Sequence, residues 1–286
     1  KGQGTLSGLA NFELKDFQSG KSLPFALTGI TQFFWDPVQD SVEFRQITLK
    51  APFGELEGKG VMNVETGEIG EVRLTGRKFV LEEIVRRFPS SQAFLPLDIG
   101  FSGEGGFDLT LQGTLDYLTV HLNFDLTSAV LAYGKIFAKP KDYPFIVNSG
   151  LLLKGGNILS GDFSLRIKQT TMKGSFTDLD MKTGIGELTL LTNKFELEGW
   201  ETLLVPFNDY KISGAAKILI HWKGDLTRLG KTDKTSNFTF ENASFLSADG
   251  RGIRKLHLLM DVSDLNLKIK DSSFEAGENP VQFEAE

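Results

Sequence analysis

The chain has 286 residues, 40% of them hydrophobic, and a formal net charge of −6, as in an ordinary folded protein. It contains no Cys, which excludes disulfides, zinc–thiolate sites and cysteine nucleophiles. The negative charge, with no basic block, argues against nucleic acid as a partner, and no run of about 18 apolar residues predicts a membrane-spanning helix.

Glycine and phenylalanine are unusually abundant, with 31 Gly and 24 Phe against 4 Tyr and 3 Trp. Phenylalanine has no polar group, so it favours either full burial or contact with an apolar ligand. Glycines punctuate residues 1–67 at the spacing of short strands, and apolar residues alternate with polar ones between them. Phe12 and Leu14, for example, alternate with Glu13 and Lys15. This section is therefore predicted to be a β meander.

A short amphipathic helix is predicted over residues 80–88. Leu81, Ile84, Val85 and Phe88 form one apolar stripe at helical spacing. Acidic residues come first and basic residues last, as the helix dipole favours, and Pro89 ends the pattern. Two turns cannot be stable alone, so we expect this helix to pack on the sheet.

Alternation with a period of two resumes after the helix and continues to the end of the chain. One apolar and one polar face indicate an antiparallel sheet rather than a buried parallel one. The apolar members of these strands are the candidates for a binding face: Phe107, Leu109, Leu111, Leu118, Val120, Leu122, Phe124, Phe163, Leu165, Ile167, Ile218, Ile220, Trp222, Phe238, Phe240, Leu265, Leu267 and Ile269.

The pattern repeats weakly along the chain. A second helix is predicted over residues 197–205, and a Gly-x-Leu-x-x-Leu motif follows each helix, at Gly113 and at Gly224. We therefore expect three sections: 1–67 as the end of a preceding β repeat, 68–183 as a repeat led by the first helix, and 184–286 as a repeat led by the second. Chance similarity among glycine-rich strands is the competing explanation.

A long sheet with one apolar face cannot leave that face in water, because each Å² of exposed apolar surface costs about 25 cal/mol. The sheet could close on itself, pair with a second sheet as a sandwich, or curl around an apolar ligand. Two helices of about 12 Å each are too short to cover such a face. We favour the third arrangement: a mainly β, elongated and highly twisted antiparallel sheet, curled into a hydrophobic groove, with short helices at the repeat starts.

The chain resembles the AsmA-like family of bacterial envelope proteins, which includes TamB. The resemblance covers most of the chain through diffuse patterns. They are LTGRKFVLEEIVRRFP (74–89), GTLDYL (113–118), GLLLKGGNILSGDFSLRIKQTTMKGSF (150–176), GDLTRL (224–229) and NLKIKDSSFEAGENPVQFEA (266–285). The start at Lys1 rather than Met indicates an internal segment of a larger chain.

This resemblance implies a periplasmic protein of a Gram-negative bacterium, tethered to the inner membrane by an anchor outside this segment. It implies a taco-shaped β groove that carries phospholipid between the inner and outer membranes, with outer-membrane or other envelope proteins as further partners. The family has no catalytic residues, so no enzyme activity and no cofactor are expected.

Polar constellations give little support to catalysis or metal binding. His121, His221 and His257 lack a second ligand at metal spacing, so we interpret them as solvated strand residues. The stretch 103–106 (GEGG) lacks the lysine of a phosphate-binding loop and is predicted to be a turn. Arg86 and Arg87 are candidate contacts for lipid headgroups, but a helix face balanced by Glu82 and Glu83 is the favoured interpretation.

Two functional hypotheses therefore remain. In the first, the apolar face binds lipid acyl chains by burial, without chemistry. In the second, the chain is a structural or adhesion-type stack of β-sandwich modules with dry cores that mediates protein contacts. A hydrolase on a β scaffold has no residue support, since no Gly-x-Ser-x-Gly motif is present.

Overall fold

The structure is a computed structural model that describes residues 5–17, 25–87, 99–114, 116–226, 232–263, 266–277 and 279–285. Within these residues the chain is mainly β, and the strands belong to one large antiparallel sheet that is not closed on itself. The mainly β, antiparallel fold predicted from the alternation is therefore confirmed. The described helices include none that is long and apolar enough to cross a membrane.

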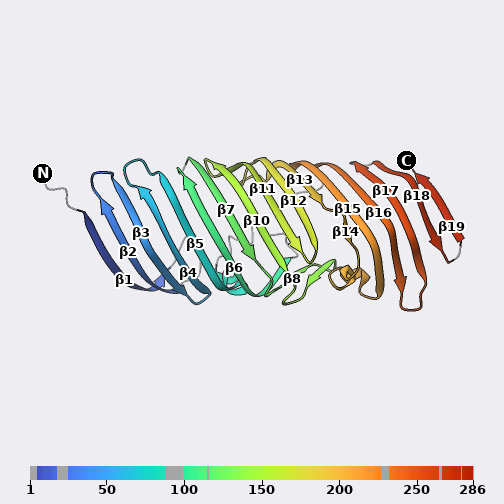
Figure 1. The fold of residues 1–286 in the computed structure, drawn as a ribbon, viewed down its shortest axis with the longest axis horizontal. Helices are drawn as coiled ribbons and strands as arrows, with labels where there is room; N and C mark the ends of the chain where they lie inside the picture. Colours follow the sequence, from blue (N-terminus) through green and yellow to red (C-terminus); the bar gives the residue numbers. More distant parts are fainter. Residues whose placement is uncertain are drawn as a thin grey trace. The chain divides into compact units, whose positions relative to one another are not determined.

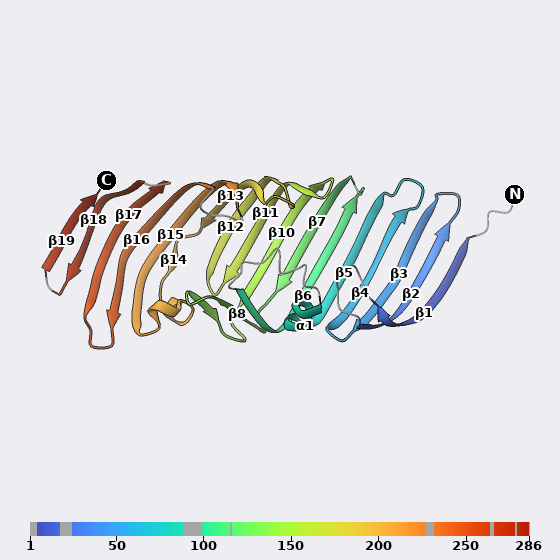
Figure 2. The ribbon, with the colours of Figure 1, turned by 180° about the vertical axis from the view of Figure 1, so that it is seen from behind.

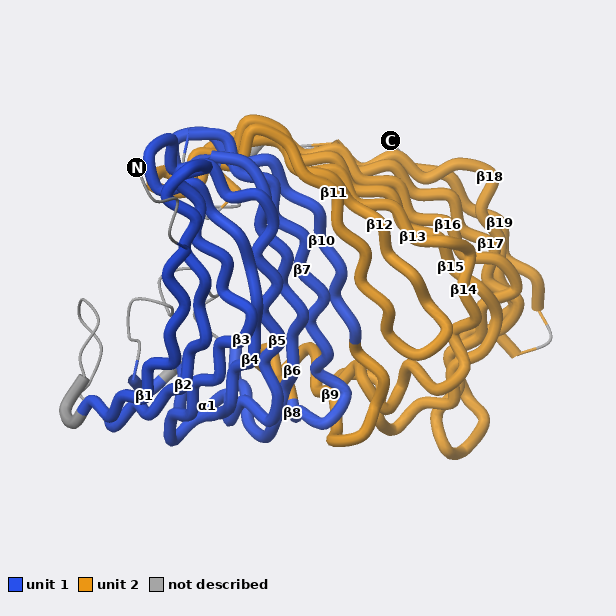
Figure 3. Tube along the Cα trace, turned by 60° about the vertical axis from the view of Figure 1, so that its left-hand side comes forward, with its two compact units in different colours: residues 1–130, 146–157 blue, residues 131–145, 158–286 orange. Residues whose placement is uncertain are grey.

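The chain divides into two compact units (Figure 3). Unit 1 comprises residues 1–130 and 146–157, and unit 2 comprises residues 131–145 and 158–286. The repeat boundaries expected at 67/68 and 183/184 each fall at a turn inside one unit. The repeats themselves stay a prediction.

Unit 1 is a meander of long strands that lie side by side in chain order (Figure 1). Its strands are β1 (Leu6–Phe17), β2 (Phe25–Asp36), β3 (Ser41–Ala51), β4 (Gly54–Asn63), β5 (Ile69–Val80), β6 (Ile99–Gly113) and β7 (Tyr117–Asp125), followed by most of β10 (Phe145–Lys154). Strand β10 pairs with β7. Each strand pairs antiparallel with its neighbour, so each unbroken stretch of register places directly opposed side chains on one face.

The predicted first helix is present as α1 (Leu81–Arg87), which lies at the end of β5 and β6 (Figure 2). Leu81 is 7% exposed and packs near Gly105 of β6. The Glu82 carboxylate accepts a hydrogen bond from the Gly103 backbone N–H, at 2.9 and 3.0 Å from its two oxygens. The helix is thus fixed to the sheet, as its short length requires. Phe88 of the predicted helix lies outside the described residues.

Unit 2 continues the same construction. Its long strands are β11 (Asn157–Ile167), β12 (Thr170–Leu179), β13 (Ile185–Thr192), β15 (Tyr210–Asp225), β16 (Thr232–Ser247), β17 (Gly252–Ser263), β18 (Asn266–Ala276) and β19 (Asn279–Ala285). They pair in that order, and the two-residue β14 (Phe195–Glu196) also pairs with β15. A short hairpin of β8 (Ala129–Tyr133) and β9 (Phe137–Lys139) lies before them in the chain.

The second predicted α-helix, over residues 197–205, is wrong as an α-helix. The structure has two 3-10 turns there, η2 (Trp200–Thr202) and η3 (Val205–Phe207). Gly199 adopts a left-handed conformation, with φ of 81°, directly before the first turn. Leu197, Trp200 and Leu203 are buried at a spacing of three residues, which matches the three residues per turn of a 3-10 helix.

This segment forms the core of unit 2. Leu203 is fully buried and Trp200 is 7% exposed, in a cluster with Phe195, Ile212 and Leu256. The Phe195 and Trp200 rings lie 5.2 Å apart between centroids. The buried apolar side chains of unit 2 therefore gather around the 3-10 turns rather than along the length of the strands.

The stretch 103–106 was predicted to be a turn, and this is wrong. It lies inside β6. Gly103 has a φ of 89°, and Gly105 lies opposite Phe79, just after a change of register between β5 and β6. The glycines thus mark an irregular stretch of a long strand, which is a common role for glycine in sheets.

The candidate apolar binding face

In unit 1 the sequence-predicted residues lie on one face of the sheet. Phe107, Leu109 and Leu111 of β6 lie directly opposite Phe124, Leu122 and Val120 of β7. Leu118 follows at the next position of this face, opposite Gly113. On the outer side of this pair of strands, Val72 and Leu74 of β5 lie opposite Leu111 and Leu109 of β6. Val147 and Leu151 of β10 lie opposite Phe124 and Val120 of β7.

This face extends across the remaining strands of unit 1, which the sequence-based site did not include. Its apolar members come in opposed pairs along β1 to β4: Leu6 and Trp35, Val42 and Met62, and Leu49 and Leu56, with Phe33 opposite Phe44. We call the face formed by these residues and those of β5, β6, β7 and β10 the apolar face of unit 1. The alternation of apolar and polar residues in 1–67 was the sequence pattern from which this extension of the face could have been predicted.

In unit 2 the predicted residues also share a face. Ile218 opposes Phe238, which opposes Met260, which opposes Ile269. The other described candidates occupy the same face through further opposed pairs: Phe163 with Gly174, Leu165 with Met172, Ile167 with Thr170, Ile220 with Leu190, Trp222 with Leu188, Phe240 with Leu258, and Leu267 with Val262. Leu265 lies outside the described residues.

Phenylalanine rings on these faces lie over glycines of the neighbouring strand. Phe33 opposes Gly8, Phe12 opposes Gly29 and Phe107 opposes Gly76 in unit 1. A methyl group added to these glycines would come within 2.9, 2.3 and 2.3 Å of the opposing ring. The abundance of both residue types thus has a common cause: a glycine leaves the space that a ring on the next strand fills.

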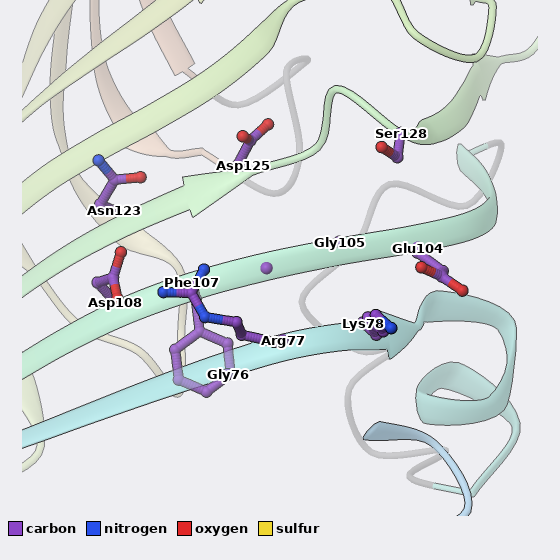
Figure 4. A pocket seen from close by; sticks show the side chains of 11 residues that line it. Gly76, Arg77, Lys78, Glu104, Gly105, Phe107, Asp108, Asn123, Asp125 and Ser128 are labelled. Carbon is purple, nitrogen blue, oxygen red and sulfur yellow. The ribbon is translucent and has the colours of Figure 1, made fainter. Parts of the chain in front are cut away.

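The opposite face of unit 1 is polar. In β6 and β7 it presents Asp108, Thr110, His121 and Asn123, and Thr75 of β5 donates a hydrogen bond to Asp108 at 2.8 Å. A pocket of about 330 Å³ lies on this side where β5 changes register (Figure 4). Asp108, Asn123 and Asp125 line it together with Arg77 and Lys78. Its mixture of both charges identifies no ligand.

The candidate headgroup contacts on α1 are already paired. The Arg86 Nη2 and Arg87 Nε atoms lie 2.5 and 3.1 Å from the same Glu83 carboxylate oxygen. The hydrogen bond from Arg86 lowers the pKa of Glu83. This arrangement favours the interpretation of a charge-balanced helix surface over one that binds lipid headgroups.

The apolar faces are only partly covered. Among the predicted residues that the structure describes, only Ile167 is buried, at 4% exposed, and Leu267 is 46% exposed. The others are half-buried. Neighbouring side chains on the sheet shield their flanks, but a dry protein core would bury most of them fully. Among the described residues of unit 1, α1 packs mainly on the ends of β5 and β6, and no described helix packs as closely on the other strands of the face.

The apolar face of unit 1 contains a groove of about 710 Å³ near the β2–β3 and β4–β5 turns. This volume lies within the range of roughly 300–1,000 Å³ that small-molecule sites occupy. Its wall is mostly apolar and aromatic, with two carboxylates: Leu6, Phe33, Trp35, Val42, Phe44 and Val64, with Asp40 and Glu65. Sequence reasoning missed this groove, since its two turns meet only in the folded sheet.

The histidines and acidic residues that the structure describes form no metal-binding arrangement. No group of three or more His, Asp and Glu side chains comes close enough to hold a metal ion in that part of the chain. His121 and His257 are exposed, and His221 lies 3.2 Å from the Thr189 hydroxyl and 3.7 Å from Glu187. These surroundings are those of partly solvated strand residues.

Comparisons of the chain with protein-family models, curated proteins and solved structures found no match.

Proposed function

We propose that this chain binds lipid acyl chains along the apolar faces of its sheet and serves as a segment of a lipid-transfer pathway. The observation that supports this proposal is the continuity of the apolar face across neighbouring strands, combined with its incomplete burial. A continuous apolar surface that stays incompletely buried on a folded protein is typical of a binding site.

The energy of binding would come from burial alone. Each methylene group removed from water contributes about 0.8 kcal/mol, so an acyl chain that lies on these half-buried Phe, Leu and Val side chains would be held without specific chemistry. The eight long strands that the structure describes in unit 1 (β1 to β7 and β10), spaced by about 4.8 Å, give a face on the order of 35 Å wide. The polar headgroup would stay in water at an edge of the sheet.

The resemblance to AsmA-like proteins supports a more specific version of this proposal. In it, the chain is part of a periplasmic bridge that moves phospholipid between the inner and outer membranes of a Gram-negative bacterium. An anchor outside this segment would hold the bridge in the inner membrane, and outer-membrane or other envelope proteins would complete it.

The alternative of stacked sandwich modules needs a second sheet that seals each apolar face. In unit 1 the described strands pair one after another, and the sequence-predicted side chains stay half-buried. In unit 2, Ile167 belongs to the buried cluster, and Leu165, Ile218 and Phe240 pack against it, so the proposal concerns the rest of that face.

Photo-crosslinking with a phospholipid that carries a diazirine in its acyl chain tests the proposal. Ile220 lies on the apolar face of unit 2, and its neighbour Leu219 points to the opposite face and is 36% exposed. Ile220→Asp should lose lipid labelling of unit 2 but keep its strand content by circular dichroism. Leu219→Asp introduces the same charge on the other face and should keep the labelling. Leu122→Asp makes the corresponding change on the apolar face of unit 1.

The proposal fails if the unmodified protein takes up no label, or if both variants reduce labelling equally. It also fails if Ile220→Asp unfolds unit 2, because that is the response of a dry core to a buried charge without a partner.

A further inference from the structure

The groove on the apolar face of unit 1 carries two carboxylates beside its apolar wall. Asp40 lies in the turn between β2 and β3, and Glu65 lies in the turn between β4 and β5. The Val64 backbone N–H donates a hydrogen bond to the Asp40 carbonyl oxygen at 2.7 Å, which joins the two turns. Asp40 and Glu65 therefore line one groove although they come from separate hairpins.

Neither carboxylate has a partner in the described structure. No hydrogen bond or ion pair involves the side chain of Asp40 or Glu65 there. The neighbouring Asp36 carboxylate, in contrast, accepts hydrogen bonds from the backbone N–H groups of Val38 and Gln39, at 2.8 and 3.2 Å. Asp36 thus stabilises its own turn, whereas Asp40 and Glu65 remain available to a ligand.

In the part of the chain that the structure describes, no basic side chain forms an ion pair with these two residues. Residues 37–40 and 64–68, which form the two turns, contain no Lys or Arg. Arg45 of β3 lies over the Phe34 ring and pairs with Glu43, and Arg73 of β5 pairs with Glu71. The described surroundings of the groove therefore combine an apolar wall with a net negative edge.

We infer that this groove selects amphiphiles that carry an ammonium group at the head of an apolar chain. The inference rests on the proposed function and specifies the class of lipid. The chain would lie against Trp35 and its apolar neighbours, and the ammonium group would lie between the carboxylates of Asp40 and Glu65. A phosphoglycerol headgroup, which has a phosphate and no ammonium, would meet repulsion at the same position.

Glu65 is exposed and Asp40 is only half-buried, so the selectivity is modest. A solvent-exposed ion pair contributes about 0.2–1 kcal/mol, so two of them give roughly a two- to thirtyfold preference for the ammonium lipid. Salt screens such pairs, so the preference should shrink at high ionic strength.

The fluorescence of Trp35 provides a direct readout. Trp35 lines the groove and is 37% exposed, whereas Trp200 is buried at 7%. In a Trp222→Phe background, quenching by single-chain lipids with a brominated acyl chain therefore reports mainly on Trp35. The three probes are lysophosphatidylethanolamine, lysophosphatidylglycerol and an uncharged monoacylglycerol, each kept below its micelle concentration.

Two matched double variants each remove two negative charges, one variant from the groove and the other from the polar face. Asp40→Asn with Glu65→Gln neutralises the groove, and Asn tolerates the left-handed φ of 47° at position 40. Glu13→Gln with Glu57→Gln makes the same change in net charge on the polar face. The groove variant should bind lysophosphatidylethanolamine and lysophosphatidylglycerol equally, whereas the control variant should keep the preference for lysophosphatidylethanolamine.

The outcomes separate the inference from the proposed function. Equal binding of lysophosphatidylethanolamine and lysophosphatidylglycerol by the unmodified groove, with quenching by monoacylglycerol, overturns the headgroup inference but leaves acyl-chain binding intact. Loss of the preference in both variants also overturns it. Absence of quenching by all three probes contradicts both proposals for this part of the face.

Discussion

Gly76 on β5 provides the sharpest test of how the apolar face is built. A methyl group at this position would lie 2.3 Å from Cε1 of Phe107 and 2.5 Å from Cε2 of Phe79. Carbon atoms in contact are normally about 3.5–4.0 Å apart, so the rings have to move by more than about 1 Å. Gly76→Ala should therefore act as an overpacking substitution.

The expected magnitude follows from two opposing effects. Overpacking costs about 1–3 kcal/mol, and replacement of Gly by Ala in a strand returns about 0.5–1 kcal/mol. The net destabilisation should be about 1–2 kcal/mol. Gly70 on the same strand is the control, because a methyl group there lies 3.5 Å from its nearest neighbour, the Val61 carbonyl oxygen. Gly70→Ala should be neutral or slightly stabilising.

Hydrogen exchange at the amides of β5 and β6 measures this effect locally, without the assumption that the whole chain unfolds in one step. Gly76→Ala should speed exchange about five- to thirtyfold, and in a Phe107→Ala background the effect should be smaller, because only the close contact with Phe79 remains. Equal exchange in the Gly76→Ala and Gly70→Ala variants would refute the reasoning, as would an unchanged penalty in the absence of the Phe107 ring.

Two further predictions separate the core from the open face and test a turn. Leu203 is fully buried and Ile220 is half-buried. In urea titrations, Leu203→Ala should therefore lower the free energy of unfolding by about 3 kcal/mol and Ile220→Ala by about 1 kcal/mol. Equal losses would contradict an open face at Ile220. Hydrogen bonds from the backbone N–H groups of Thr183 and Lys182 hold the pKa of the Asp180 carboxyl group below its ordinary value of 3.8. The ionised carboxylate therefore stabilises the turn at pH values above 3.8, and this stabilisation is lost as the pH falls through the lowered pKa. A titration of the Asp180 carboxyl group by NMR should show a midpoint below 3.8, and a midpoint at or above that value would contradict the hydrogen bonds.

The sequence was sufficient to predict the faces of the strands, because alternation depends only on local spacing. Phe107, Leu109 and Leu111 were assigned to one face from their period of two, and the register with β7 places them together with Leu122 and Phe124. The pairing of glycines with rings could not be predicted in the same way, since it depends on which residues face each other across strands.

The two helix predictions show where local sequence patterns are not sufficient. The apolar stripe of residues 81–87 fits an α-helix, and α1 forms there. The segment 197–205 has a similar composition, but the left-handed Gly199 interrupts it and Pro206 follows closely. Tertiary packing of Trp200 and Leu203 then favours 3-10 turns. The groove beside Asp40 and Glu65 was also out of reach, because it depends on contact between two separate turns.

The placement of rings over glycines has a consequence for movement along the sheet. A ring that lies across a neighbouring glycine fills a depression, so the apolar face of unit 1 presents similar hydrocarbon from one strand to the next. A lipid tail that steps by one strand spacing, about 4.8 Å, would exchange equivalent contacts and meet a low barrier. Such a surface has no intrinsic direction, so any net flow along it must be driven by a difference in lipid chemical potential between its two ends.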